Sequence, residues 1–113
     1  RRGDVPEAEQ KARDEAGKHD YASALKRVKE MLARYIDEPE VRERLVKLQD
    51  EILDGAKGYV ASRRAEAKDL GGRSRGDEAR AVLQALLVSL GDGTVPEFED
   101  WCRIVRNELE AVR

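Results

Sequence analysis

Residues 21–35 read YASALKRVKEMLARY, and this stretch decides the fold class. Its apolar residues follow one another in steps of four and three, namely Tyr21, Leu25, Val28, Leu32 and Tyr35. That spacing places them on one face of an α-helix and leaves the charged residues between them on the opposite face. The stretch therefore predicts an amphipathic helix that buries one side.

The same spacing returns in the next part of the chain, after Pro39. The apolar positions there are Val41, Leu45, Leu48, Ile52, Ala56 and Tyr59. They predict a long helix that continues toward Leu70. Gly55 and Gly58 weaken its middle by about 1 kcal/mol each relative to alanine, so the sequence leaves open whether this helix is continuous.

Each of the three prolines lies in one repeated local pattern that marks the start of a helix. The three tetrapeptides are Asp4-Val5-Pro6-Glu7, Asp37-Glu38-Pro39-Glu40 and Thr94-Val95-Pro96-Glu97. The Asp or Thr side chain can accept a hydrogen bond from the first turn, and the glutamate three residues later can reach back to it. Proline fits the first turn because its missing N–H has no partner there. We therefore expect helix starts capped by Asp4, Asp37 and Thr94.

The remaining helices follow from glycine positions and apolar spacing. Gly71 and Gly72 end the long helix, Asp77 caps the next one, and Gly91 closes it. No segment alternates with the period of a strand. We predict an all-α fold of about five amphipathic helices in antiparallel hairpins, with one shared core. Its predicted members are Leu25, Val28, Leu32, Leu45, Leu48, Ile52, Leu86, Trp101 and Val105.

Length and charge limit the class of protein. The 113 residues fit a single domain spanning residues 1–113, and because the sequence starts at Arg1 we expect an excerpt of a larger protein. A net charge of −2 gives no basic field for nucleic acid. No apolar stretch approaches the roughly 20 residues of a membrane-spanning helix. We expect a soluble chain that neither binds nucleic acid nor inserts into a membrane, with the cytoplasm as the default compartment.

The segment His19-Asp20-Tyr21-Ala22-Ser23-Ala24-Leu25 resembles the turn and second-helix start of a tetratricopeptide repeat, typically G-D-Y-x-x-A-I. A weaker echo is Gly76-Asp77-Glu78-Ala79-Arg80-Ala81-Val82. Its anchoring alanine, Ala81, lies farther from Ala24 than the repeat period of about 34 residues. The resemblance therefore covers the first 36 or so residues, and the remainder only as helix-turn-helix architecture; any antiparallel helix pair with a tight turn can produce the same pattern. It implies a non-catalytic scaffold that binds proteins or peptides.

The chain offers few groups for catalysis. Cys102 is the only cysteine and His19 the only histidine, so neither a disulfide nor a thiolate metal cluster can form within one chain. We expect His19 in a turn and Cys102 on an apolar helix face, which is a poor arrangement for a nucleophile and its base. Asp92-Gly93-Thr94 is followed by Arg103 where a calcium loop needs an acid. We predict no enzyme activity, no cofactor and no metal site.

The best candidate for partner contact is the glycine-rich loop from Gly71 to Gly76, which carries Arg73 and Arg75. It is not a phosphate-binding P-loop, because Asp77 and Glu78 follow its last glycine. Arg63 and Arg64 lie close in sequence, and arginines bind carboxylates or phosphates through paired donors. A solvated loop is the simpler interpretation. We predict a mobile loop whose binding residues are Arg63, Arg64, Arg73 and Arg75.

These observations favour a non-catalytic protein-protein interaction module, an adaptor or scaffold, that binds a protein or peptide partner. A second hypothesis is a structural self-assembly element, because steps of four and three also fit a coiled-coil seam. A third is a regulatory helical domain attached to an enzyme. The sequence does not distinguish among the three.

Overall fold

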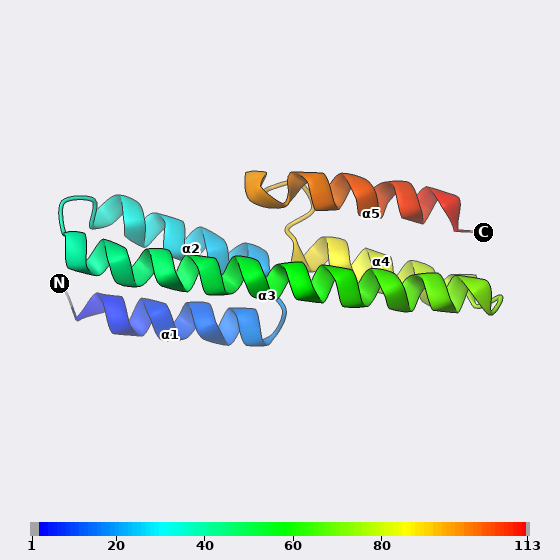
Figure 1. Cartoon of the computed structure of the whole chain (residues 1–113), viewed down its shortest axis with the longest axis horizontal. Helices are drawn as coiled ribbons and strands as arrows, with labels where there is room; N and C mark the ends of the chain where they lie inside the picture. Colours follow the sequence, from blue (N-terminus) through cyan, green and yellow to red (C-terminus); the bar gives the residue numbers. More distant parts are fainter. Residues whose placement is uncertain (1–2, 113) are drawn as a thin grey trace. The chain divides into compact units, whose positions relative to one another are not determined.

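The computed structural model describes residues 3–112, and within them every regular element is helical (Figure 1). The elements are α1 (Asp4–Gly17), α2 (Tyr21–Arg34), α3 (Pro39–Gly72), α4 (Gly76–Ser89), a short 3-10 turn η1 (Pro96–Phe98) and α5 (Glu99–Ala111). The predicted all-α fold with five α-helices is confirmed. Helix α3 is continuous through Gly55 and Gly58, so neither glycine interrupts it.

The residues group into two compact units, one that ends at Ala56 and one that begins at Lys57. Unit 1 holds α1, α2 and the first part of α3, and unit 2 holds the rest of α3, α4 and α5. Each unit is described by itself below. The single domain expected from chain length stays a prediction.

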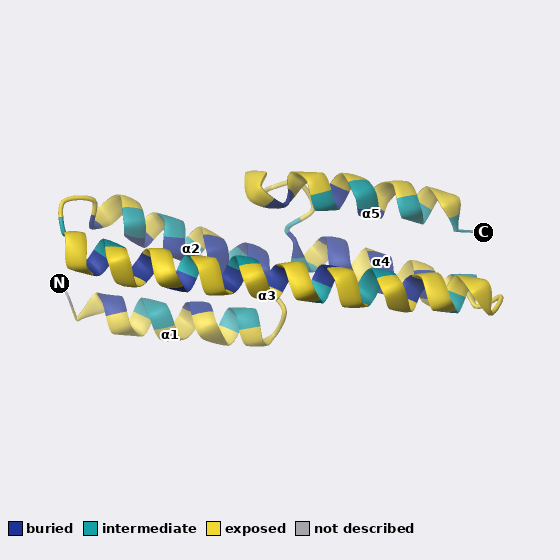
Figure 2. Cartoon of the chain, viewed as in Figure 1, coloured by how far each residue is buried: buried dark blue, intermediate teal, exposed yellow. Residues whose placement is uncertain are grey.

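Unit 1 packs α1, α2 and the first part of α3 through the apolar faces that the sequence predicts (Figure 2). Its buried residues are Val5, Ala12, Tyr21, Ala22, Ala24, Leu25, Val28, Met31, Tyr35, Val41, Leu45, Leu48, Ile52 and Ala56. Leu32 is half-buried, so its assignment to the core was wrong. Its carbonyl accepts a hydrogen bond of 3.0 Å from Nη1 of Arg42, which ties the end of α2 to the start of α3.

Unit 2 has its own set of buried side chains. They are Val60, Ala67, Ala79, Val82, Leu83, Leu86, Leu87, Leu90, Val95, Phe98, Cys102 and Val105. Trp101 was also predicted in the core but is half-buried, with its ring stacked on Phe98 at a centroid distance of 5.6 Å. Leu86 and Val105 are buried as predicted.

Pro39 and Pro96 begin helical elements and Pro6 lies in the first turn of α1, but Asp4, Asp77 and Thr94 are not the caps that the sequence predicts; the cap at Asp37 stays a prediction. Asp4 lies inside α1, whose N-cap is Gly3, and Asp77 lies in the first turn of α4, after the N-cap Arg75. Thr94 instead donates a hydrogen bond of 2.8 Å to the carbonyl of Gly91. Acids in a first turn still stabilise a helix through its dipole, which explains their enrichment without a capping bond.

Three helices end in the same backbone motif, in which one residue adopts a positive φ. These residues are His19 (62°), Ser74 (62°) and Gly91 (79°). In each case the following N–H bonds back across the turn, from Asp20 to Glu15, from Arg75 to Leu70 and from Asp92 to Leu87. This is the Schellman arrangement, and it satisfies carbonyls that the helix end leaves free.

The shared motif makes the turn at Ser74 comparable with the turn at His19. Ser74 is the counterpart of His19, so α4 starts at Gly76, which corresponds to Tyr21 at the start of α2. The counterpart of the buried Ala24 is therefore Ala79, which is fully buried, whereas the predicted anchor Ala81 is exposed.

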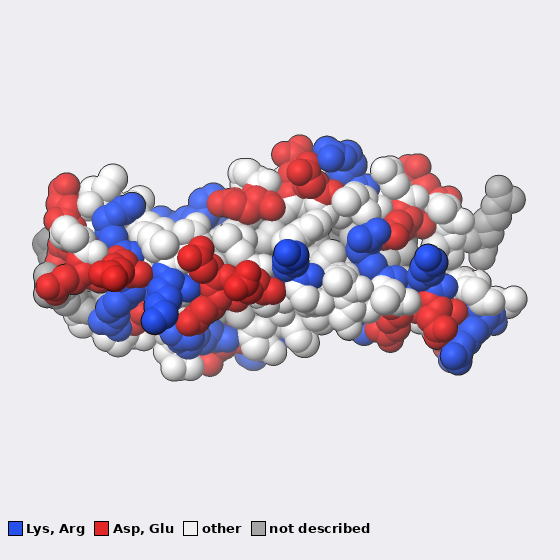
Figure 3. Space-filling model, viewed as in Figure 1, with Lys and Arg blue, Asp and Glu red and all other residues white. Residues whose placement is uncertain are grey.

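The surface carries intermingled charges of both signs over the face that Figure 3 shows. Within residues 3–112, no helix combines the length and the apolar character needed to cross a membrane.

Candidate functional site

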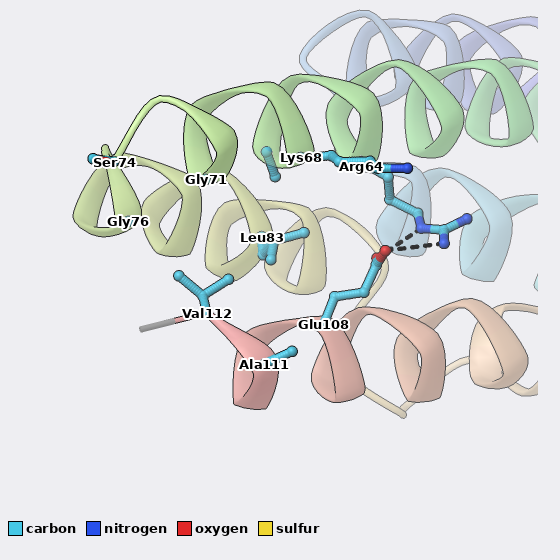
Figure 4. Close-up of a pocket in the computed structure, with 10 residues that line it drawn as sticks. Arg64, Lys68, Gly71, Ser74, Gly76, Leu83, Glu108, Ala111 and Val112 are labelled. Carbon is cyan, nitrogen blue, oxygen red and sulfur yellow. Dashed lines mark hydrogen bonds and ion pairs between the residues drawn. The ribbon is translucent and has the colours of Figure 1, made fainter.

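Unit 2 contains a groove of about 730 Å³ near the turn that joins α3 to α4 (Figure 4). Its lining includes Ala67, Lys68 and Gly71 of α3, Leu83 of α4, and Glu108 and Ala111 of α5. Leu83 is almost fully buried at the base, whereas Lys68 and Ala111 are exposed on the walls. The groove therefore combines a narrow apolar base with a polar rim.

The groove lies beside the last turn of α5 and the turn that joins α3 to α4. Helices α3 and α5 run in the same direction, since each is antiparallel to α4 (Figure 1). From the level at which Arg64 contacts Glu108, α3 continues to Gly72 but α5 only to Ala111. At a rise of about 1.5 Å per residue, α3 extends roughly 7–8 Å farther. Among residues 3–112, α3 therefore extends past α5 on this side of the groove.

A bidentate ion pair fixes α5 against α3 in this position. Nε and Nη2 of Arg64 donate to the two carboxylate oxygens of Glu108 at 2.7 and 3.0 Å. The hydrogen bond to Glu108 raises the pKa of Arg64 above its ordinary value, although burial acts in the opposite direction. Arg64 is thus one of the predicted partner-binding residues, but in the free protein its guanidinium is already bound.

Arg80 binds carbonyl oxygens at the C-terminal end of α5. Its Nη1 donates to the carbonyl oxygens of Leu109 and Val112, each at 3.1 Å. A cation at a helix C-terminus also interacts favourably with the helix dipole. The α5 terminus beside the groove is therefore held by Arg64 from one side and by Arg80 from another.

The predicted residues Arg73 and Arg75 flank Ser74 in the turn beside the groove. Arg73 pairs with Asp69 at 3.3 Å, and Arg75 donates to Glu78 at 2.7 Å. All four side chains are at least half exposed, and such local pairs contribute little to stability. The helices leave only residues 73–75 between them, so the predicted loop from Gly71 to Gly76 is shorter than expected. Its mobility stays a prediction.

Arg63 lies apart from the groove lining. Its guanidinium carbon sits 5.9 Å from the centre of the Tyr59 ring, and its Nη1 pairs with Glu66. The structure therefore assigns the four predicted arginines to different positions. Arg64 lines the groove, Arg73 and Arg75 lie in the adjacent turn, and Arg63 packs on α3 itself.

Lys68 and Glu108 line the groove, but sequence reasoning did not select them. Lys68 follows Arg64 by one helical turn, so the shared helix face was a usable signal. Glu108 lies 44 residues from Arg64, and nothing in the sequence pairs these two positions. Only the packing of α5 on α3 brings them together.

Unit 1 has a smaller hollow of about 370 Å³ where α1 ends and α2 begins. Its lining includes Gly17, Tyr21 and Gly55. The ion pair between Arg13 and Glu51, at 2.9 Å, contributes two more lining residues. Because this hollow is smaller, the groove in unit 2 is the stronger candidate.

The structure places His19 in the exposed turn of unit 1 and buries Cys102 in unit 2. In the part of the chain that the structure describes, no three His, Cys, Asp or Glu side chains gather in a way that could hold a metal ion. Comparison of the chain with protein-family models, with curated proteins and with solved structures gave no match. The candidate site therefore depends on its own geometry.

Proposed function

We propose that the protein is a non-catalytic protein-protein interaction module and that the groove in unit 2 contacts the partner. The observation that carries this proposal is the groove itself, whose apolar base at Leu83 lies beside the α3–α4 turn and between the polar side chains of Lys68 and Glu108. A segment of another protein can lay an apolar side chain on this base while its polar groups meet the rim.

The tetratricopeptide-like start of the chain is in accord with this role. Helices α1 and α2 form a hairpin through the turn at His19, where the repeat typically has glycine. His19 adopts a positive φ, a conformation that glycine reaches at least cost. A scaffold or regulatory role within a larger protein would use the same surface.

Self-assembly through a coiled-coil seam has less support. The seam residues of α2 and the first part of α3 include Leu25, Val28, Leu45, Leu48 and Ile52, and all of them are buried within unit 1. A second copy could reach them only if unit 1 opened. We therefore place the contact surface at the groove.

The proposal is tested by site-specific photo-cross-linking in cells that produce the protein. p-Benzoylphenylalanine in place of Ala111 lies on the groove wall, whereas the same group in place of Ala61 lies on an exposed part of α3 outside the groove. We expect defined protein adducts from position 111 that are absent from position 61. Adducts of equal yield at both positions, or none at position 111, would contradict the assignment of the groove.

A variant that fills the groove with a larger side chain adds a second criterion to the cross-linking experiment. Gly71 lines the groove, and a Cβ at this position would meet no atom within 4 Å. Gly71→Leu should therefore occupy the groove without disturbing its neighbours, and it should remove the adduct at position 111. The matched control is Gly72→Leu, because Gly72 also has free space but lies outside the lining.

A further inference from the structure

We propose that the groove takes a short amphipathic helical segment of an acidic partner, with Lys68 as the cation that receives a partner carboxylate. This inference rests on the proposed function and names the chemistry of its partner. It follows from the small residues of the groove walls and from the balance of charge around the groove.

The small residues of the groove walls favour a helical segment as the occupant. The walls carry small residues, including Ala67, Gly71 and Gly76. Small residues allow two helix backbones to approach closely, so a docked turn can reach the Leu83 base with one aliphatic side chain.

The charge balance favours an acidic partner. The lining holds two cations, Arg64 and Lys68, against one carboxylate, Glu108. Arg64 and Glu108 neutralise each other through their bidentate pair. Lys68 is exposed and makes no ion pair with any residue from 3 to 112. The groove therefore presents one unmatched positive charge beside an apolar base.

Two arginines in the turn between α3 and α4 can increase the preference for an acidic partner. Arg73 and Arg75 are bound to Asp69 and Glu78 only through exposed pairs within their own helix termini. Such pairs are weak and screened by salt, so a partner carboxylate can replace one of them at small cost. An acidic segment thus meets Lys68 in the groove and two exchangeable arginines at its rim.

The test is an NMR titration of the isotope-labelled full chain with two synthetic peptides of about 15 residues, near the length at which isolated helices form. Both peptides carry leucines one helical turn apart. One has glutamates at the flanking positions and the other has lysines. We expect the acidic peptide to shift the amide signals of Lys68, Gly71, Ser74 and Gly76, and the basic peptide to leave them in place.

Two substitutions and their controls make the result specific. Lys68→Glu should weaken binding of the acidic peptide about five- to tenfold, whereas Lys47→Glu, the same change at an exposed site in unit 1, should not. Gly71→Leu should abolish the shifts, and Gly72→Leu should preserve them.

The outcomes separate this inference from the proposed function. Equal or stronger binding of the basic peptide in the groove would overturn the acidic partner but leave the groove as a contact surface. Shifts that map outside the groove, or no shifts at millimolar peptide, would overturn both. Loss of binding in the Lys47→Glu control would show that net charge alone attracts the peptide, which also overturns the role of Lys68.

Discussion

Substitution of glycine by alanine should change stability in opposite directions at two positions of unit 2. Gly58 lies inside α3, is exposed, and a Cβ there would meet no atom within 4 Å. Its replacement removes the conformational freedom of glycine from a helix interior and introduces no clash. Gly58→Ala should therefore stabilise unit 2 by about 1 kcal/mol.

Gly93 provides the opposite case. It adopts a φ of +92°, and a Cβ there would lie 3.1 Å from Nη2 of Arg106. Alanine adopts such a backbone only with strain, and the Arg106 side chain would also have to move. Gly93→Ala should therefore destabilise unit 2 by about 1–2 kcal/mol.

Trp101 is a built-in reporter for both variants. It is the only tryptophan of the chain, it lies in unit 2, and its ring stacks on the buried Phe98. Urea unfolding followed by its fluorescence therefore reports on the unit that contains both glycines. With a urea dependence of about 2 kcal/mol per molar, the midpoints should rise by about 0.5 M for Gly58→Ala and fall by about 0.5–1 M for Gly93→Ala.

The two variants test different parts of the fold. An unchanged or lower midpoint for Gly58→Ala would mean that α3 is not helical at this position, and the continuous helix would be refuted. A midpoint for Gly93→Ala equal to that of the parent would mean that the turn before α5 does not hold the positive φ.

Three other changes test the packing and the helix termini. Leu48→Ala should cost about 2–5 kcal/mol, because Leu48 is 2% exposed in unit 1, and circular dichroism during urea unfolding measures the loss. Asp20→Ala should cost about 0.5–2 kcal/mol in the same assay, because the Asp20 side chain accepts a hydrogen bond from the N–H of Ser23 at the start of α2. Arg80→Ala should speed hydrogen exchange in the last turn of α5 and leave exchange in unit 1 unchanged; equal protection in variant and parent would remove Arg80 as the clamp.

The helices themselves could be predicted from the sequence because each depends on local information. The steps from Tyr21 to Tyr35 fix one buried face, and proline at the first turn fixes a start wherever it occurs. The residues at which the helices end were harder to predict from the sequence than the helices themselves. His19 and Ser74 adopt positive φ without the glycine that normally signals it, so the tight turn at Ser74 was mistaken for a longer loop.

The continuity of α3 also depends on information that the local sequence lacks. Two glycines weaken the helix locally, but packing on neighbouring helices supplies most of the stability of a helix in a protein. A Cβ at Gly55 would lie 3.4 Å from Cε1 of Tyr21, so α2 packs closely against α3 there. Only the tertiary structure shows this contact, which lies at the part of α3 where the two glycines predict a weak helix.

The candidate site could be predicted only in part, for a physical reason that concerns α5. The sequence indicates an excess of arginine around the α3–α4 turn, but it does not show how far α5 reaches along α3. The sequence also does not pair Arg64 with Glu108, whose side chains meet only after the chain folds. This ion pair neutralises the arginine that the sequence favours, so Lys68, which the sequence did not single out, is the lining cation without an ion pair among residues 3–112.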